Sequence, residues 1–207
     1  SRRSFLQRMG LGVGALGAGL FGGLVLPESV LAVCEPPGNP GTPKPWRKDC
    51  RMILPRRPAS TLSASEITQL KDAYKAMRAL DTSAPNDPRG FLRQANVHCW
   101  YCGAGTQVHF TWQFFAWHRA YLYFHERILG KLIGDMNFRL PYWDWDTPSH
   151  RKLPGAYSDP NDNSNPLWNG TRSMDPTEEI PEEDGGEDVM EAALTADTFT
   201  ESGGTAS

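Results

Sequence analysis

The chain has 207 residues, of which 39% are hydrophobic and 22% are charged, with a formal net charge of −3 at pH 7. This composition is typical of a soluble globular domain and excludes a collagen, a coiled coil and a wholly disordered protein. The length favours a single domain with a substantial core. The charge balance also argues against a nucleic-acid-binding protein.

The first 32 residues have the features of an export signal. Arg2 and Arg3 precede an uncharged run over 9–27, and Ala32 is a small residue at a plausible cleavage position. This order is typical of a twin-arginine translocation signal, which is read by a receptor. A membrane-spanning helix is the alternative, because about 20 apolar residues suffice, but seven glycines weaken it. We therefore predict a signal over 1–32, cleaved after Ala32, and no permanent membrane anchor afterwards.

Acidic and basic residues are divided unevenly along the chain. All 21 Lys and Arg lie at or before Arg172, whereas 11 of the 24 Asp and Glu follow it, so the two parts carry net charges of +8 and −11. The acidic part has little apolar surface to offset its ordering entropy. We predict that residues 174–207 form a disordered acidic tail, with an interaction tail or a processing linker as the functional alternatives.

The remaining chain predicts helices joined by long irregular connections. Residues 33–61 are rich in Pro, Gly and basic residues and should form an irregular arm. A capping box at 63–66 precedes apolar residues at helical spacing, which predicts a helix over 65–80. A short helix is expected over 91–98, and a long one over 113–133 that is apolar on most faces and therefore buried. The absence of alternating strand and helix patterns makes the expected fold class mainly α.

Histidine and cysteine gather in one segment, at His98, Cys102, His109 and His118. Imidazole suits copper, zinc or iron, and thiolates favour softer or tetrahedral sites. A structural zinc site would use Cys99 and Cys102 but lacks a second cysteine pair. A redox pair is the second alternative, although no strand-then-helix pattern frames it. The third is that these residues belong to an aromatic-rich core.

Helical geometry limits which histidines can share a metal. Nine residues separate His109 from His118, which is half a turn out of phase, so both can face one ion only if the helix begins after His109. His125 lies about 10.5 Å of helical rise beyond His118, too far for the same ion, and is expected to be packed inside or to support the site. His150 lies in a polar loop and is expected to be solvated.

Three segments resemble the first copper-binding region of plant polyphenol oxidases, the catechol oxidase and tyrosinase-like enzymes of the type 3 copper family. They are ANVHCWYC, QVHFTWQFFAWHRAYLYFHERILGKLIGD and LPYWDWD. The resemblance runs from about Leu62 to Thr171, and His-x3-Cys, Cys-x6-His and His-x8-His spacings occur in it together. It implies that residues 62–173 form the first half of the copper domain, a part of a four-helix bundle with long loops and disordered termini.

The resemblance also implies roles for single residues. His98, His109 and His118 would bind one copper ion, with no catalytic residue in this half beyond those ligands. Cys102 would be joined to His109 by a thioether bond. Cys50 and Cys99 would form a disulfide, which leaves Cys34 without a partner; Cys34 with Cys50 is the alternative pairing.

The implied activity is the oxidation of o-diphenols to o-quinones with dioxygen, which in this family needs two coppers with three histidines each. The chain has five histidines in all. It is therefore expected to be an N-terminal portion that is inactive alone, with a phenolic substrate and dioxygen as partners of the complete enzyme. The alternative is a non-enzymatic fragment that binds a single copper or zinc ion. The twin-arginine segment resembles the thylakoid-transfer peptide of these enzymes, which implies the chloroplast thylakoid lumen.

Overall fold

The computed structural model describes five parts of the chain, which are residue 38, 53–104, 108–158, 164–170 and 175–197. The predicted signal over 1–32 lies outside these residues, as do Cys34 and Cys50. Within the described parts the chain is mainly helical, as the sequence predicts, and no strand is formed beyond two isolated β-bridges. None of the helices described is both long and apolar enough to span a bilayer.

Helix α2 (Ala64–Ser83) begins at the predicted capping box. The hydroxyl of Ser63 accepts a hydrogen bond from the Glu66 amide, and the Glu66 carboxylate accepts one from the Ser63 amide at 2.8 Å. Two amides that would otherwise lack a partner at the helix start are thereby satisfied. A short 3-10 turn, η2 (Ala59–Thr61), precedes this cap.

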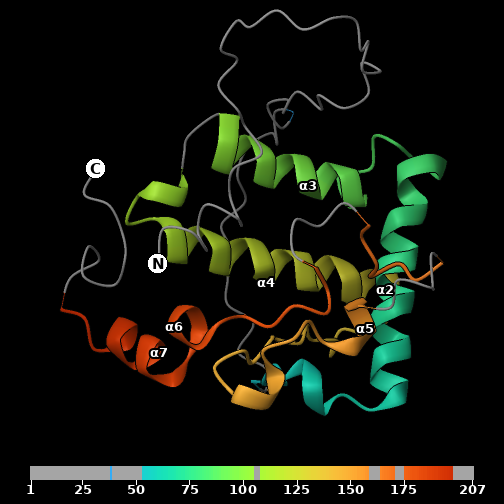
Figure 1. Ribbon diagram of the computed structural model, residues 1–207. Coiled ribbons are helices and arrows are strands. Elements are labelled where there is room, and N and C mark those ends of the chain that lie inside the picture. Colours follow the sequence, from blue (N-terminus) through green and yellow to red (C-terminus); the bar gives the residue numbers. More distant parts are fainter. Residues whose placement is uncertain (1–37, 39–52, 105–107, 159–163, 171–174, 198–207) are drawn as a thin grey trace, which may run out of the picture.

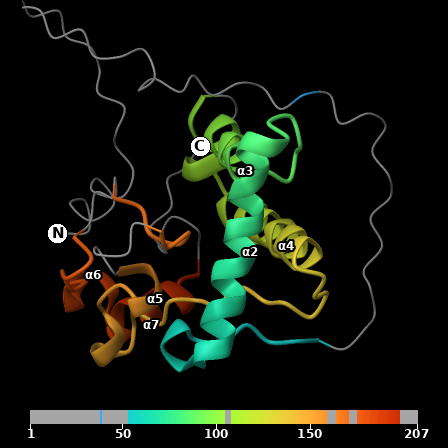
Figure 2. The same cartoon turned by 90° about the vertical axis from the view of Figure 1, so that its right-hand side faces the viewer.

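Helices α3 (Phe91–Cys99) and α4 (Phe114–Leu132) run side by side, and α2 crosses the same end of both (Figures 1 and 2). Between α3 and α4 the chain forms a π-helical turn, η3 (Trp100–Ala104), and a 3-10 turn, η4 (Val108–Phe110). The core lies where α2 meets the carboxyl half of α4 and the segment after it. Its buried residues are Leu70, Ala73, Met77, Leu129, Phe138, Leu140 and Leu167.

Helix α4 differs from the prediction that it is buried on most sides. Its carboxyl half is buried at Leu129 and ends before Gly134, whose φ of 74° suits glycine at a helix end. Phe115 and Leu122, in contrast, are exposed large side chains on the amino half. The aromatic composition predicts burial all round, but the buried residues of α4 all lie in its carboxyl half, at His125, Glu126, Leu129 and Gly130.

The acidic segment that composition predicts to be disordered is ordered over 175–197 and contains α6 (Glu182–Gly185) and α7 (Glu187–Leu194). Ile180 is 3% exposed, and its amide donates to the Arg151 carbonyl at 3.1 Å. This contact lies beside the turns η5 (Pro148–His150) and α5 (Gly155–Ser158). One buried isoleucine and a basic, aromatic neighbourhood supply the anchoring that a composition count cannot see.

Candidate metal centre

Four side chains from four consecutive elements meet at one point beside the α3–α4 pair. His98 stands at the end of α3, Cys102 in the π-helical turn, His109 on η4 and His118 in the first turns of α4. Their donor atoms all lie within 4.8 Å of one another. A π-helical turn is rare and often marks a functional site. Helix α4 begins at Phe114, so His109 precedes it, as the nine-residue spacing requires.

The distances within this cluster suit a single metal ion. The Nε2 atoms of His109 and His118 are 3.2 Å apart, and the ring centroids of His98 lie 5.3 Å and 5.4 Å from those of the other two histidines. Two nitrogens that each lie about 2.1 Å from one ion are about 3.0–3.5 Å apart at angles of 90–110°. The spacing of the two Nε2 atoms falls in that interval.

A hydrogen bond fixes which nitrogen of His118 faces the cluster. Its Nδ1 lies 2.7 Å from the carbonyl oxygen of Phe114, one turn earlier in α4. Because a carbonyl only accepts, Nδ1 carries a proton, and in the neutral ring this leaves the lone pair on Nε2. Nε2 is also the atom that faces His109 and, at 3.6 Å, the Cys102 sulfur. The backbone of α4 thus turns Nε2 of this histidine toward the other donor atoms of the cluster.

Burial favours the neutral form of two histidines in the cluster. Partial burial lowers the pKa of His98, and the neighbouring His109 and His118 lower it further. Burial and then His118 lower the pKa of His109. Both rings are therefore neutral at lower pH than a free imidazole, and metal binding requires the neutral form. Burial raises the pKa of Cys102 to about 11, so its sulfur is a protonated thiol near neutral pH and a poor ligand. The donor set fits a metal held by three imidazoles.

Aromatic side chains of α4 surround the histidines. The Tyr121 ring lies 5.8 Å from that of His98 and stacks on Trp117 at 5.2 Å. The Tyr121 hydroxyl donates to the Gln94 carbonyl at 2.8 Å, which ties α4 to α3 one turn before His98. Sequence reasoning missed this residue. Its position three residues after His118 places it on the same helical face and is the signal that would have found it.

The other two histidines lie apart from the cluster. His125 is 7% exposed, and its Nε2 lies 3.2 Å from the Tyr74 hydroxyl, in agreement with the expectation that it packs inside. His150 differs from the expected solvated residue. Its side chain is 34% exposed, with Nδ1 2.5 Å from an Asp144 carboxylate oxygen, and its carbonyl accepts from the Trp143 indole. The loop therefore folds back on itself through contacts that its polar composition does not reveal.

The two cysteines of the cluster segment differ in state. Cys99 is disulfide-bonded, and its partner lies outside the described residues. Cys102 is a buried free thiol. The pairing of Cys99 with Cys50 and the thioether between Cys102 and His109 therefore stay predictions.

Comparison with known proteins adds the family. The common central domain of tyrosinase matches residues 75–204, which is more than half of the chain. The chain belongs to the tyrosinase family. This family uses copper, and the histidine cluster is a group able to hold such an ion. Copper is accordingly the cofactor that the family and the donor set both indicate.

Individual relatives confirm the resemblance to plant polyphenol oxidases. The latent polyphenol oxidase of Prunus armeniaca is 43% identical over 64% of this chain and 23% of its own length. Catechol oxidase B of Solanum tuberosum is 47% identical over 49% of this chain and 18% of its own length. A solved latent aurone synthase, also a polyphenol oxidase, superposes with a TM-score of 0.59 at 37% identity, over 66% of this chain and 29% of that one. The chain spans about a fifth of the length of these curated relatives.

Proposed function

We propose that this chain supplies one copper site of an enzyme that oxidises o-diphenols to o-quinones with dioxygen. His98, His109 and His118 are the three proposed ligands, through ring nitrogens. The observation that carries the proposal is the convergence of these rings with Nε2 of His118 turned inward by the Phe114 carbonyl. When bound, copper supplies the one-electron redox chemistry and the affinity for dioxygen that phenol oxidation requires.

The surrounding residues prepare the site. Neutral imidazoles at His98 and His109 need not lose a proton before binding, because burial has already lowered their pKa values. Tyr121 and Trp117 exclude water from one side of His98. The buried thiol of Cys102 lies within 4.8 Å of the donor atom of His109, which supports the proposed thioether between them. Such a bond would hold the His109 ring at one angle.

The disulfide between Cys50 and Cys99 is part of the same proposal. Cys99 is disulfide-bonded and Cys102 is free, so Cys34 and Cys50 are the two candidates for its partner among the four cysteines. A bond to Cys50 would join the irregular arm to the end of α3. It fits an oxidising compartment, and we propose the thylakoid lumen, because relatives such as that of Prunus armeniaca are named chloroplastic.

We further propose that the 207-residue chain has no diphenol oxidase turnover by itself. The family's chemistry uses two metals a few ångströms apart, and this chain has five histidines. Two of them, His125 and His150, are held in other contacts, by Tyr74 and Asp144. The second candidate function is the binding of a single copper or zinc ion without catalysis. The number of histidines in the chain, five, also favours it.

Metal analysis and oxygen uptake test both proposals on three proteins. The wild-type chain, His118→Ala and His150→Asn are each loaded with copper or zinc, and metal per chain is measured after desalting. We expect about one copper in the wild type and in His150→Asn, and a loss of binding in His118→Ala. Zinc binding without copper would overturn the copper assignment.

Oxygen consumption with a catechol then addresses turnover. We expect none above free copper in any of the three proteins. Uptake that depends on His118 at about 1–1000 per second, the usual range for enzymes, would contradict the proposal that the chain is inactive alone.

A further inference from the structure

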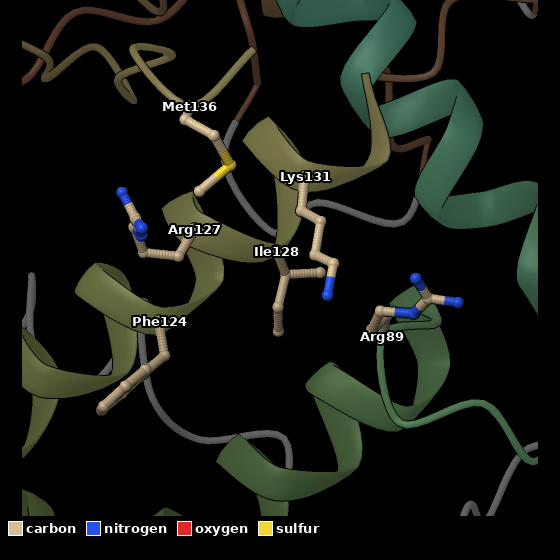
Figure 3. A pocket seen from close by; sticks show the side chains of 6 residues that line it. All are labelled: Arg89, Phe124, Arg127, Ile128, Lys131 and Met136. Atoms are coloured by element: carbon tan, nitrogen blue, oxygen red, sulfur yellow. The ribbon is translucent and has the colours of Figure 1, made fainter. Parts of the chain in front are cut away.

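A groove lies on the outer side of α4, beside the loop that leads into α3 (Figure 3). It has a volume of about 510 Å3 and is lined by three basic and three apolar residues, which are Arg89, Arg127, Lys131, Phe124, Ile128 and Met136. Ile128 and Lys131 point from α4 into the space next to Arg89. Phe124 is 51% exposed. The groove therefore offers apolar contact and positive charge side by side.

The positive charge of the groove is largely unbalanced. Arg89 is paired with Asp87 at 2.6 Å. Arg127 and Lys131, in contrast, form no ion pair with any residue that the structure describes. An occupant that fits would place an apolar side chain at Phe124 and carboxylates at Arg127 and Lys131.

Helix α7 presents such a combination on its exposed face. Glu187, Glu191 and Leu194 are all exposed and follow one another at intervals of four and three residues, which places them in one row along the helix. Leu194 is 81% exposed, the second most exposed of the large hydrophobic residues described. Neither carboxylate has an ion-pair partner in the described part of the chain.

The two rows match in register when the helices run antiparallel. Along α4, Phe124, Arg127 and Lys131 follow one another at intervals of three and four residues. An antiparallel α7 then sets Glu187 against Lys131, Glu191 against Arg127 and Leu194 against Phe124. Both rows are about 10.5 Å long, because each spans seven residues at a rise of 1.5 Å. In this arrangement each glutamate faces a basic residue, and Leu194 faces Phe124.

The contact cannot form within one chain as it is folded. Ile180 and the Arg151–Glu182 ion pair hold the α6–α7 segment on the α5 side of the molecule, apart from the outer side of α4 in both views (Figures 1 and 2). We propose that α7 of one copy of this chain docks into the α4 groove of a second copy. Two such contacts close a two-fold dimer. Because one eight-residue helix covers less area than a standard interface, the association is weak and sensitive to salt.

Charge reversal tests this proposal on the 207-residue chain. One variant reverses the groove, with Arg127→Glu and Lys131→Glu, and the other reverses the helix, with Glu187→Lys and Glu191→Lys. Sedimentation equilibrium at low salt measures association. Exposed ion pairs are each worth up to about fivefold in affinity. Each variant reverses all four ion pairs of the proposed dimer, so we expect it to associate about tenfold more weakly than the wild type. An equimolar mixture of the two variants should regain association, because both contacts are again between opposite charges.

Lys75→Glu is the matched control, since it reverses one exposed lysine on α2, away from the groove. It should associate like the wild type, whereas Lys131→Glu alone should not. Circular dichroism checks that every variant keeps its helix content.

A wild-type chain that stays monomeric at about 100 µM would overturn the proposal. So would association that both double variants retain, because it would then occur through the exposed aromatic residues of the amino half of α4. A mixture that remains as weakly associated as its components would also overturn it.

Discussion

The two halves of α4 each contain a histidine, and the two histidines have different surroundings. In the amino half, His118 turns Nε2 toward two other histidines, and Phe115 beside it is exposed. In the carboxyl half, His125 is buried with Nε2 near the Tyr74 hydroxyl, and its Nδ1 has no hydrogen-bond partner in the described part of the chain. Both histidines lie on one face of the helix, two turns apart.

The comparison teaches that the contacts of the ring, and not helical position, decide what a histidine does. A backbone carbonyl occupies Nδ1 of His118 and leaves Nε2 for a metal. The His125 ring lies against those of Tyr74 and Tyr121, and its burial lowers its pKa to about 4. One end of the helix is therefore suited to copper binding, and the other holds the fold together.

The largest effect is expected from Glu126→Ala in the carboxyl half. Glu126 is buried, and one of its oxygens accepts hydrogen bonds from Arg56 at 2.8 Å and from the Leu140 amide at 2.9 Å. Arg139 lies 3.7 Å from the other oxygen. Removing the carboxylate leaves these donors without their partner, which we expect to lower the free energy of unfolding by about 3–5 kcal/mol. Urea unfolding followed by tryptophan fluorescence measures the change.

Glu183→Ala on α6 is the control, because that side chain is exposed and its loss should change stability by less than about 0.5 kcal/mol. Copper bound per folded chain should stay the same in both variants. A loss of copper binding in Glu126→Ala while the chain is still folded would show that the two ends of α4 do not act separately.

The second effect is a dependence of stability on pH that comes from His125. Burial lowers the pKa of His125 from 6.5 to about 4. Above pH 6.5 the ring is neutral in both states, so it adds no pH dependence. As the pH falls below 6.5, the unfolded chain takes up a proton that the folded chain does not, and stability falls by about 3 kcal/mol by pH 4.

His125→Phe keeps an aromatic ring and removes this proton uptake. Urea unfolding of both proteins with a chelator present, between pH 7.5 and 4.5, isolates the contribution of His125, because the other histidines titrate equally in both. We expect the wild type to lose stability more steeply than the variant below pH 6.5. If the free energies of unfolding of the two proteins fell in parallel with pH, His125 would be protonated in the folded chain. Burial would then not explain why His125 differs from His118.

Local sequence patterns predicted much of this architecture. The capping box located the start of α2 at Ser63, and Gly134 marked the end of α4. The nine-residue interval from His109 to His118 required a break between them, and η4 and the start of α4 provide it. In each case the determining contacts lie within a few residues along the chain, where spacing alone carries the information.

Features that depend on distant contacts were not predictable. The hydrogen bond from Tyr121 to Gln94 joins residues 27 apart; the spacing from His118 places Tyr121 near the cluster but does not identify Gln94 as its partner. The order of the acidic segment rests on Ile180 meeting Arg151. Composition treats that segment in isolation, whereas buried Ile180 and the Arg151–Glu182 ion pair attach it to a neighbouring loop. The exposure of Phe115 likewise reflects which elements cover α4 and not its own sequence.

The smallest effect is expected from Tyr121→Phe in the amino half. The variant keeps the ring that packs against His98 and removes the hydroxyl that donates to the Gln94 carbonyl. A hydrogen bond of this kind contributes about 1 kcal/mol net. If it serves to hold α3 where His98 meets His109 and His118, its loss appears as about fivefold weaker copper binding. Competition with a chelator measures the affinity, and the Cu(II) electron paramagnetic resonance spectrum reports the ligand geometry.

Tyr142→Phe is the control for Tyr121→Phe, because Tyr142 is an exposed tyrosine that pairs with Pro58 and does not belong to the cluster of His98, His109 and His118. It should leave copper affinity and the spectrum unchanged. If Tyr121→Phe lowers the free energy of unfolding but binds copper as tightly as the wild type, the hydroxyl only fastens two helices together. Weaker binding with an altered spectrum, at nearly unchanged stability, would instead show that the amino half of α4 orients His98 through the backbone of its neighbour. That result would extend to a second ligand what the Phe114 carbonyl does for His118.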